Sequence, residues 1–165
     1  MGWVNLLEQK LKALGETVEL TNASISGDTT SGGRSRLAAL LARHTPQIVI
    51  IELGGNDALR GLPLAMSQDN LSVMVEQAQQ AGAKVILVGM QIPPNYGREY
   101  GQTFKNIFRE VSTTKKAPLV PFLLEGVGPQ NEMFQSDGIH PNESAQPIMM
   151  ETVLKVLLPV IKGIN

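Results

Sequence analysis

Cysteine is absent from the 165 residues of this chain. Its absence excludes disulfide bonds, metal sites built on thiolates and a cysteine nucleophile. Histidine is scarce, with one copy at position 44 and one at 140, and no cluster of carboxylates accompanies them to complete a metal site. The sequence therefore predicts no metal and no cofactor, and any histidine chemistry rests on His44 or His140.

Long apolar runs and a strong net charge are also missing. No run of 18 apolar residues occurs, so we expect no membrane span. The net charge is −1 and no basic run is present, so we expect neither nucleic acid nor an anionic membrane surface as a partner. Residues 1–15 are amphipathic and charged, unlike a signal peptide. The length and the 42% hydrophobic content predict one domain over residues 1–165.

Segments with helical spacing of apolar residues alternate with strand candidates, of which the one at 18–23 is short and the later ones contain continuous apolar runs, typical of buried strands. We expect helices near 3–14, 34–44, 64–81, 100–114 and 142–161, and strands at 18–23, 48–54, 84–90 and 119–124. This alternation predicts an α/β fold in which a parallel sheet carries helices on both faces.

The polar and glycine-rich segments follow the predicted strands along the chain. They lie at 24–33, 54–61 and 91–97 and in the segment that contains DGIHP at 137–141. Ligands of open parallel sheets bind beyond the carboxyl ends of the strands. We therefore expect these segments to converge at one end of the sheet.

The motif Gly-Gly-Asn-Asp at 54–57 has two interpretations. A glycine pair after a buried strand usually forms a tight turn, and taken alone the motif favours that role for Asn56. The side-chain amide of Asn56 could instead donate a hydrogen bond to an oxyanion that develops at the strand end.

The loop at 24–33 also has two interpretations. It lacks the signature of a phosphate-binding loop, so it could be a flexible connection in which Thr30 or Ser31 caps the next helix. Alternatively, the backbone N–H of Gly27 points into the crevice, because glycine lets the backbone approach a substrate oxygen closely.

The DGIHP segment is the most informative. Asp137 precedes His140 by three residues, so one loop can supply both groups. A carboxylate that accepts from Nδ1–H fixes the tautomer of the ring and leaves Nε2 free to act as a base. A surface turn is the alternative, but the pairing favours catalysis. His44 lies near a predicted helix C-terminus, where it complements the helix dipole, and we assign it no chemistry.

Taken together, the motifs resemble the SGNH, or GDSL, hydrolase superfamily, and within it the small bacterial acyl-CoA thioesterases, arylesterases and lysophospholipases. The resemblance runs along the whole chain and rests on NASISGDT (22–29), ELGGNDALRG (52–61), PPNYGREY (93–100) and DGIHPNESAQP (137–147). It implies a three-layer α/β/α flavodoxin-like fold with a five-stranded parallel sheet. It also implies acyl transfer on a small acyl ester or thioester, and members are often periplasmic or secreted.

The resemblance also implies roles for individual residues. Asp137 corresponds to the acid that orients the histidine, and His140 to the general base. The Gly27 N–H and the Asn56 side chain correspond to two of three oxyanion donors. The family's serine and first strand belong to a block upstream of the helix at 3–14, so we expect this chain to contain neither the serine nor that strand.

Several alternatives stay open from the sequence. Ser24 or Ser26 could substitute as the nucleophile, or both could be structural hydroxyls that bond nearby backbone. The chain could be a catalytically inactive protein that only binds acyl or ester ligands. A doubly wound nucleotide-binding domain is disfavoured, because no glycine fingerprint follows any predicted strand. A sheet without its first strand exposes open strand edges, which favours a homodimer or strand exchange.

Overall fold

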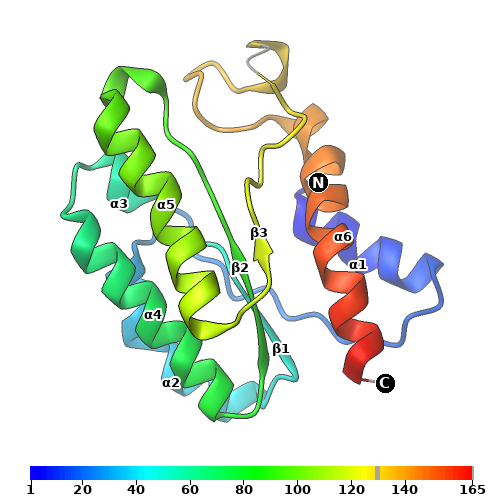
Figure 1. The fold of residues 1–165 in the computed structure, drawn as a ribbon. Helices are drawn as coiled ribbons and strands as arrows, with labels where there is room; N and C mark the ends of the chain where they lie inside the picture. The colour runs from blue at the N-terminus through cyan, green and yellow to red at the C-terminus, as the bar shows by residue number, and fades with distance from the viewer. Residues whose placement is uncertain (129–130, 165) are drawn as a thin grey trace. The chain divides into compact units, whose positions relative to one another are not determined.

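The computed structural model describes residues 1–128 and 131–164 (Figure 1). Their contacts divide the chain into two compact units, one formed by Met1–Ser24 with Leu123–Asn165 and the other by Ile25–Phe122. The first unit joins two segments that are far apart in the sequence. The single domain expected over residues 1–165 is not tested by this division and stays a prediction.

A parallel sheet forms the centre of the Ile25–Phe122 unit. It contains β1 (Ile48–Ile51), β2 (Lys84–Val88) and β3 (Leu119–Val120), in the order β1-β2-β3. Residues 85–88 of the central strand are buried, whereas residues 48–50 of β1 are only half-buried. A central strand buried on both faces needs a continuous apolar run, and β2 supplies it. The predicted α/β class with a parallel sheet is confirmed.

Helices accompany the sheet within the same unit. They are α2 (Thr30–His44), α3 (Gly55–Leu59), α4 (Leu64–Gln80), the short 3₁₀ helix η1 (Pro94–Tyr96) and α5 (Arg98–Lys115). Helix α4 contacts both α2 and α5 (Figure 1). The rings of Phe104 and Phe108 on α5 meet edge to face at 5.2 Å and belong to the buried core. The core thus lies where α4 and α5 meet the sheet.

The other unit is helical. Helix α1 (Trp3–Ala13) packs against α6 (Gln146–Ile164), and the 3₁₀ helices η2 (Asn131–Met133) and η3 (Glu143–Ala145) precede α6. Apolar residues four apart are buried on α1, as the helical spacing predicts. Among the residues that the structure describes, no helix combines the length and the apolarity needed to cross a bilayer.

The strand expected at 18–23 is wrong, because these residues form no regular secondary structure. Val18 and Leu20 alternate with polar residues, a pattern that suits a strand only where a neighbouring strand pairs with it. Within the described residues the sheet contains three strands, not the five that the resemblance implies. The expected strand at 48–54 ends at Ile51, and Gly54, at φ +117°, begins the turn into α3.

Helix α2 begins earlier than expected. Its N-cap is Thr29, whose hydroxyl accepts from the N–H of Gly32, so the interpretation in which Thr30 or Ser31 caps the helix is wrong. The sequence 54–57 forms the start of a short helix and not a simple turn. Position 33 in α2 leaves little room for a side chain, because a Cβ there would lie 2.3 Å from the Leu53 side chain. The glycines that suggested a longer loop instead allow close packing.

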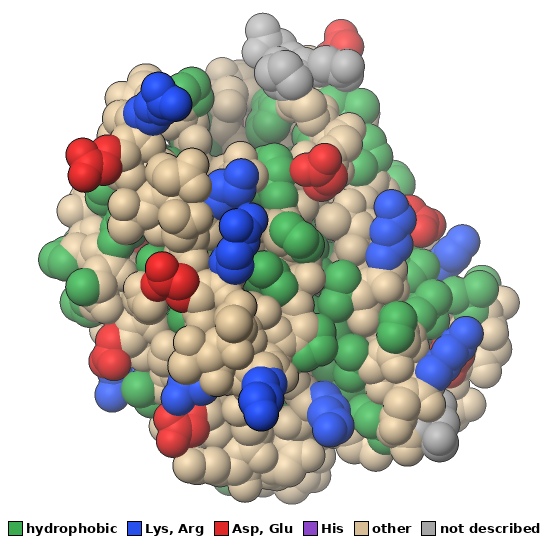
Figure 2. Space-filling view, in the orientation of Figure 1, with side chains coloured by type: hydrophobic (Ala, Val, Ile, Leu, Met, Phe, Trp, Pro, Cys, Tyr) green, Lys and Arg blue, Asp and Glu red, His purple; other side chains and the backbone are tan. Residues whose placement is uncertain are grey.

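Basic and acidic side chains lie interspersed on the face shown in Figure 2. This distribution agrees with the net charge of −1. Charges of both signs spread over a surface generate no strong field of one sign there.

Candidate active site

His140 and Asp137 lie in the loop between η2 and η3. The Nδ1 atom of His140 lies 2.6 Å from Oδ2 of Asp137, which confirms the expected hydrogen bond. With the proton on Nδ1, the ring donates to the carboxylate and keeps Nε2 unprotonated and able to accept a proton. The side chains of His140 and Asp137 are 65% and 44% exposed, so a reacting group can reach the ring.

Asp137 also accepts hydrogen bonds from the backbone. Its Oδ1 atom accepts from the N–H groups of Ile139 and His140 at 2.9 and 3.0 Å, and Gly138 takes the left-handed conformation that this tight turn requires. The side-chain hydrogen bond with His140, followed by these backbone bonds, lowers the pKa of Asp137 to about 2. Asp137 is therefore a carboxylate at neutral pH, as an orienting acid must be.

A short antiparallel pairing holds this loop. Phe134 forms a β-bridge with Pro141, and the N–H of Gln135 donates to the carbonyl of His140 at 2.7 Å. The Asn142 side chain donates to the carbonyl of Phe134 and accepts from the N–H of Ser144, which caps η3. The backbone on both sides of His140 is thus fixed, although the ring itself is exposed.

Gly27 lies in the exposed loop before α2. Its φ of +79° is in the left-handed region that favours glycine. Its carbonyl accepts from Arg60 at 3.0 Å. No backbone acceptor for the N–H of Gly27 occurs among the residues that the structure describes. This N–H is therefore available to a ligand.

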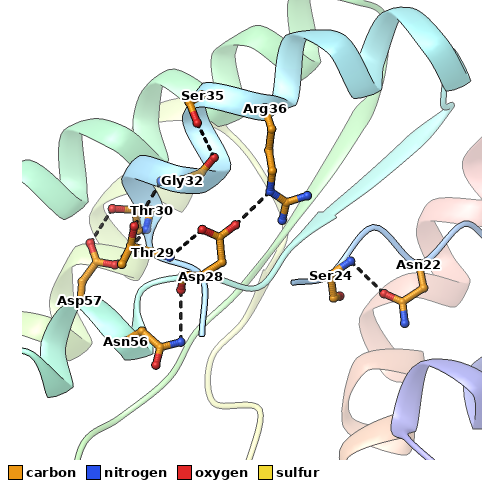
Figure 3. A network of polar contacts seen from close by, with 10 residues as sticks. All are labelled: Asn22, Ser24, Asp28, Thr29, Thr30, Gly32, Ser35, Arg36, Asn56 and Asp57. Carbon is orange, nitrogen blue, oxygen red and sulfur yellow. Dashed lines mark hydrogen bonds and ion pairs between the residues drawn. The ribbon is translucent and has the colours of Figure 1, made fainter. Parts of the chain in front are cut away.

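Asn56 lies in the first turn of α3. Its Nδ2 atom donates to the backbone carbonyl of Asp28 at 3.1 Å (Figure 3). An amide NH₂ group has two hydrogens. The bond to Asp28 uses one hydrogen, and in the described part of the chain the second has no hydrogen-bond partner. Asn56 is therefore linked to the residue that follows Gly27.

The candidate residues thus form two pairs, one in each unit. Asp137 and His140 are hydrogen-bonded, and Asn56 is bonded to the carbonyl next to Gly27. That all four residues face one cavity stays a prediction, as do their catalytic roles.

The sequence interpretation missed a buried polar group beside Asn56. The carboxylate of Asp57 accepts from the backbone N–H of Thr30 at 2.9 Å, from its hydroxyl at 2.5 Å and from the hydroxyl of Ser67 at 2.7 Å. Asn70 in turn donates to the Thr30 hydroxyl at 3.1 Å. These four residues are all buried, and we call them the Asp57 cluster. Their separations in the sequence gave no local signal.

The other serine and histidine candidates lie in a local turn and at a helix end. Ser24 and Ser26 are exposed, and the N–H of Ser24 donates to the Asn22 side chain in a local turn (Figure 3). His44 is the last residue of α2, where sequence analysis placed it. In the described residues no three His, Asp or Glu side chains gather closely enough to hold a metal ion.

Several relatives align with almost the whole of this sequence. The chain matches the GDSL-like Lipase/Acylhydrolase family over residues 1–146. It is 50% identical over 160 residues to Esterase TesA of Pseudomonas aeruginosa, covering 97% of this chain and 80% of that protein. It is 39% identical over 159 residues to Thioesterase 1/protease 1/lysophospholipase L1 of Escherichia coli, covering 96% and 75%.

A solved structure agrees with these similarities. The psychrotrophic esterase EstA from Pseudoalteromonas sp., inhibited by monoethylphosphonate, matches with a TM-score of 0.92 at 38% identity. The match covers 98% of this chain and 88% of that chain, which confirms the expected fold. Sequence, fold and motif order therefore agree, and this chain belongs to the GDSL-like lipase/acylhydrolase family of SGNH hydrolases.

Proposed function

We propose that this chain carries the acid–base pair and two oxyanion donors of a serine hydrolase for small acyl esters or thioesters. The observation that carries the proposal is the 2.6 Å contact between His140 Nδ1 and an ionised Asp137. The named relatives support it, since they are an esterase and a thioesterase.

In the proposed reaction, Nε2 of His140 takes the proton of a serine hydroxyl while the serine oxygen attacks the acyl carbon. The imidazolium that forms is stabilised by the carboxylate of Asp137. The carbonyl oxygen of the substrate becomes an oxyanion, which accepts from the N–H of Gly27 and the free amide hydrogen of Asn56. His140 then gives its proton to the departing alcohol or thiol, and water releases the acid in a second, equivalent step.

We further propose that none of the 165 residues supplies the nucleophilic serine. Ser24 and Ser26 flank the oxyanion loop but are exposed, and Ser24 participates through its backbone in a local turn. The resemblance to the SGNH hydrolases implies a serine at a strand end upstream of the helix that corresponds to α1. The triad proposed here therefore needs a serine from outside these residues.

The alternative proposal is a protein that binds acyl or ester ligands without hydrolysing them. Triad enzymes that lose one member keep about 10³–10⁴-fold catalysis over water from the oxyanion hole and binding. We therefore expect slow turnover of p-nitrophenyl acetate by the 165-residue chain, which a binding protein would not show.

A histidine pair gives this assay a matched control. His140→Ala should lower the slow turnover to the part that the oxyanion hole and binding sustain without a base, whereas His44→Ala should leave it unchanged. Equal rates for both variants and for buffer would support the binding protein. Robust turnover that is lost in Ser24→Ala or Ser26→Ala would identify a substitute nucleophile and contradict the proposal of an external serine.

We also propose that the chain associates with a second copy through β1. Within the described sheet β1 pairs on one side only, and residues 48–50 stay half-buried. An unpaired strand edge is a template for another chain. Light scattering should give twice the 17.8 kDa chain mass, as a homodimer or strand-exchanged pair. A monomer mass at all protein concentrations would contradict this.

A further inference from the structure

Asp57 is fully buried and yet accepts three hydrogen bonds. A buried carboxylate is strongly disfavoured unless donors compensate for its lost hydration. Two of its bonds come from Thr30, the first residue of α2, where the N-terminal end of the helix favours a negative charge. The third comes from Ser67 on α4. Asp57 thus joins three helices at one point.

Hydrogen bonds continue from the Asp57 cluster toward the surface. Thr30 accepts from Asn70 through its hydroxyl, and Asn70 accepts from Arg34 at 3.1 Å. The Thr30 hydroxyl therefore both donates and accepts, which only a hydroxyl at this position can do. Arg34 also pairs with Asp69, whose side chain is exposed. The buried part of the network ends at Asn70.

This cluster lies directly beside the two oxyanion donors. Asp57 follows Asn56 in α3, and Thr30 follows the loop that contains Gly27. Figure 3 shows two links to α3, one from Asn56 to the Asp28 carbonyl in this loop and one from Asp57 to Thr30 at the start of α2. The first link is partly exposed, whereas the second is buried.

We propose that Asp57 is a positioning residue that fixes the Asn56 amide relative to the Gly27 N–H. An oxyanion hole works only when its donors are held in place before the reaction. One hydrogen bond links the Asn56 side chain to the loop, and the bonds between Asp57 and Thr30 hold α3, which carries Asn56, against the start of α2. The inference rests on the proposed function of the two donors.

Two variants at Thr30 test this role. Thr30→Val keeps the shape and the backbone N–H but removes the hydroxyl, whereas Thr30→Ser keeps the hydroxyl. In the ¹⁵N NMR spectrum, Thr30→Val should shift the Gly27 amide and the Asn56 side-chain amide. It should also speed exchange of the Asn56 amide hydrogens by about tenfold, the equivalent of one lost hydrogen bond. Thr30→Ser should restore the native spectrum at both sites.

Two further variants keep the test decisive. Ser67→Ala removes one donor to Asp57 from another helix and should move the same two resonances, so it decides the matter if Thr30→Val does not fold. Asp69→Asn removes the exposed carboxylate beside Arg34 and should leave both resonances in place. Unmoved Gly27 and Asn56 resonances in Ser67→Ala and Thr30→Val, or equal shifts in Asp69→Asn, would overturn the proposal.

The spectra need no turnover, so they separate this inference from the proposed function. If the resonances move as expected and the ester assay shows no catalysis dependent on His140, the positioning role of Asp57 stands and the hydrolase proposal fails. If turnover depends on His140 and the resonances stay fixed, the hydrolase proposal stands and the role of Asp57 is wrong.

Discussion

Gly89→Ala is expected to lower the free energy of unfolding of this chain by about 3 kcal/mol, because overpacking a dense core costs about that much. Gly89 follows β2, and its N–H donates to the Val120 carbonyl at 2.7 Å. A Cβ at this position would lie 2.3 Å from the carbonyl oxygen of Pro121. That atom belongs to the backbone, so it cannot turn away as a side chain could, and the ends of β2 and β3 must separate.

The matched control is the same substitution in a helix. Gly101 lies inside α5, and an added Cβ would meet only the Ile92 side chain, at 4.0 Å. Gly101→Ala should therefore raise the free energy of unfolding by about 0.5–1 kcal/mol, since alanine loses less backbone entropy in a helix. Urea unfolding followed by circular dichroism measures both changes. Equal stability of the two variants would show that the junction of β2 and β3 is not packed as described.

The helices were predictable because their packing repeats within a few residues. On α1 the buried Leu7 and Leu11 lie four positions apart, and β2 is one continuous apolar run. The segment at 18–23 shows the limit of such patterns. Its alternation favours a strand, but a strand forms only where a neighbouring strand pairs with it. The local sequence does not show whether such a neighbour is present.

The start of α2 could not be predicted for a similar reason. Thr29, Thr30 and Ser31 are all good N-cap residues, and propensity does not choose among them. The structure chooses Thr29, and the hydroxyl of Thr30 is engaged instead by Asp57, 27 residues further along the chain. The spacing of the motifs did not indicate this contact between Thr30 and Asp57.

In the candidate site, too, contacts close in the sequence were easier to predict than distant ones. The pairing of Asp137 with His140 was predictable, because a separation of three residues closes the contact within one turn. The link between Asn56 and the carbonyl of Asp28 spans 28 residues, and the sequence predicted only that the two segments converge at one end of the sheet. The buried Asp57 was missed, because an aspartate beside an asparagine after two glycines is typical of a turn.

A serine supplied from outside these residues should raise the esterase rate by roughly 10³-fold or more, since loss of a triad member costs about 10⁴ to 10⁶ in turnover. The suitable change joins an apolar strand that ends in Gly-Asp-Ser ahead of the α1 helix. We expect this strand to lie beside β1, which pairs on one side only within the described sheet. The control is the same extension ending in alanine, which restores the strand but not the hydroxyl.

The most direct test of the central claim is the initial rate of p-nitrophenyl acetate hydrolysis by the serine-extended chain with and without His140→Ala. If His140 is the base for an external serine, the extended chain should be fast. His140→Ala should then return it to the rate of the alanine-ended control. An extended chain no faster than that control, or one whose rate survives His140→Ala, would contradict the assignment of the Asp137–His140 pair.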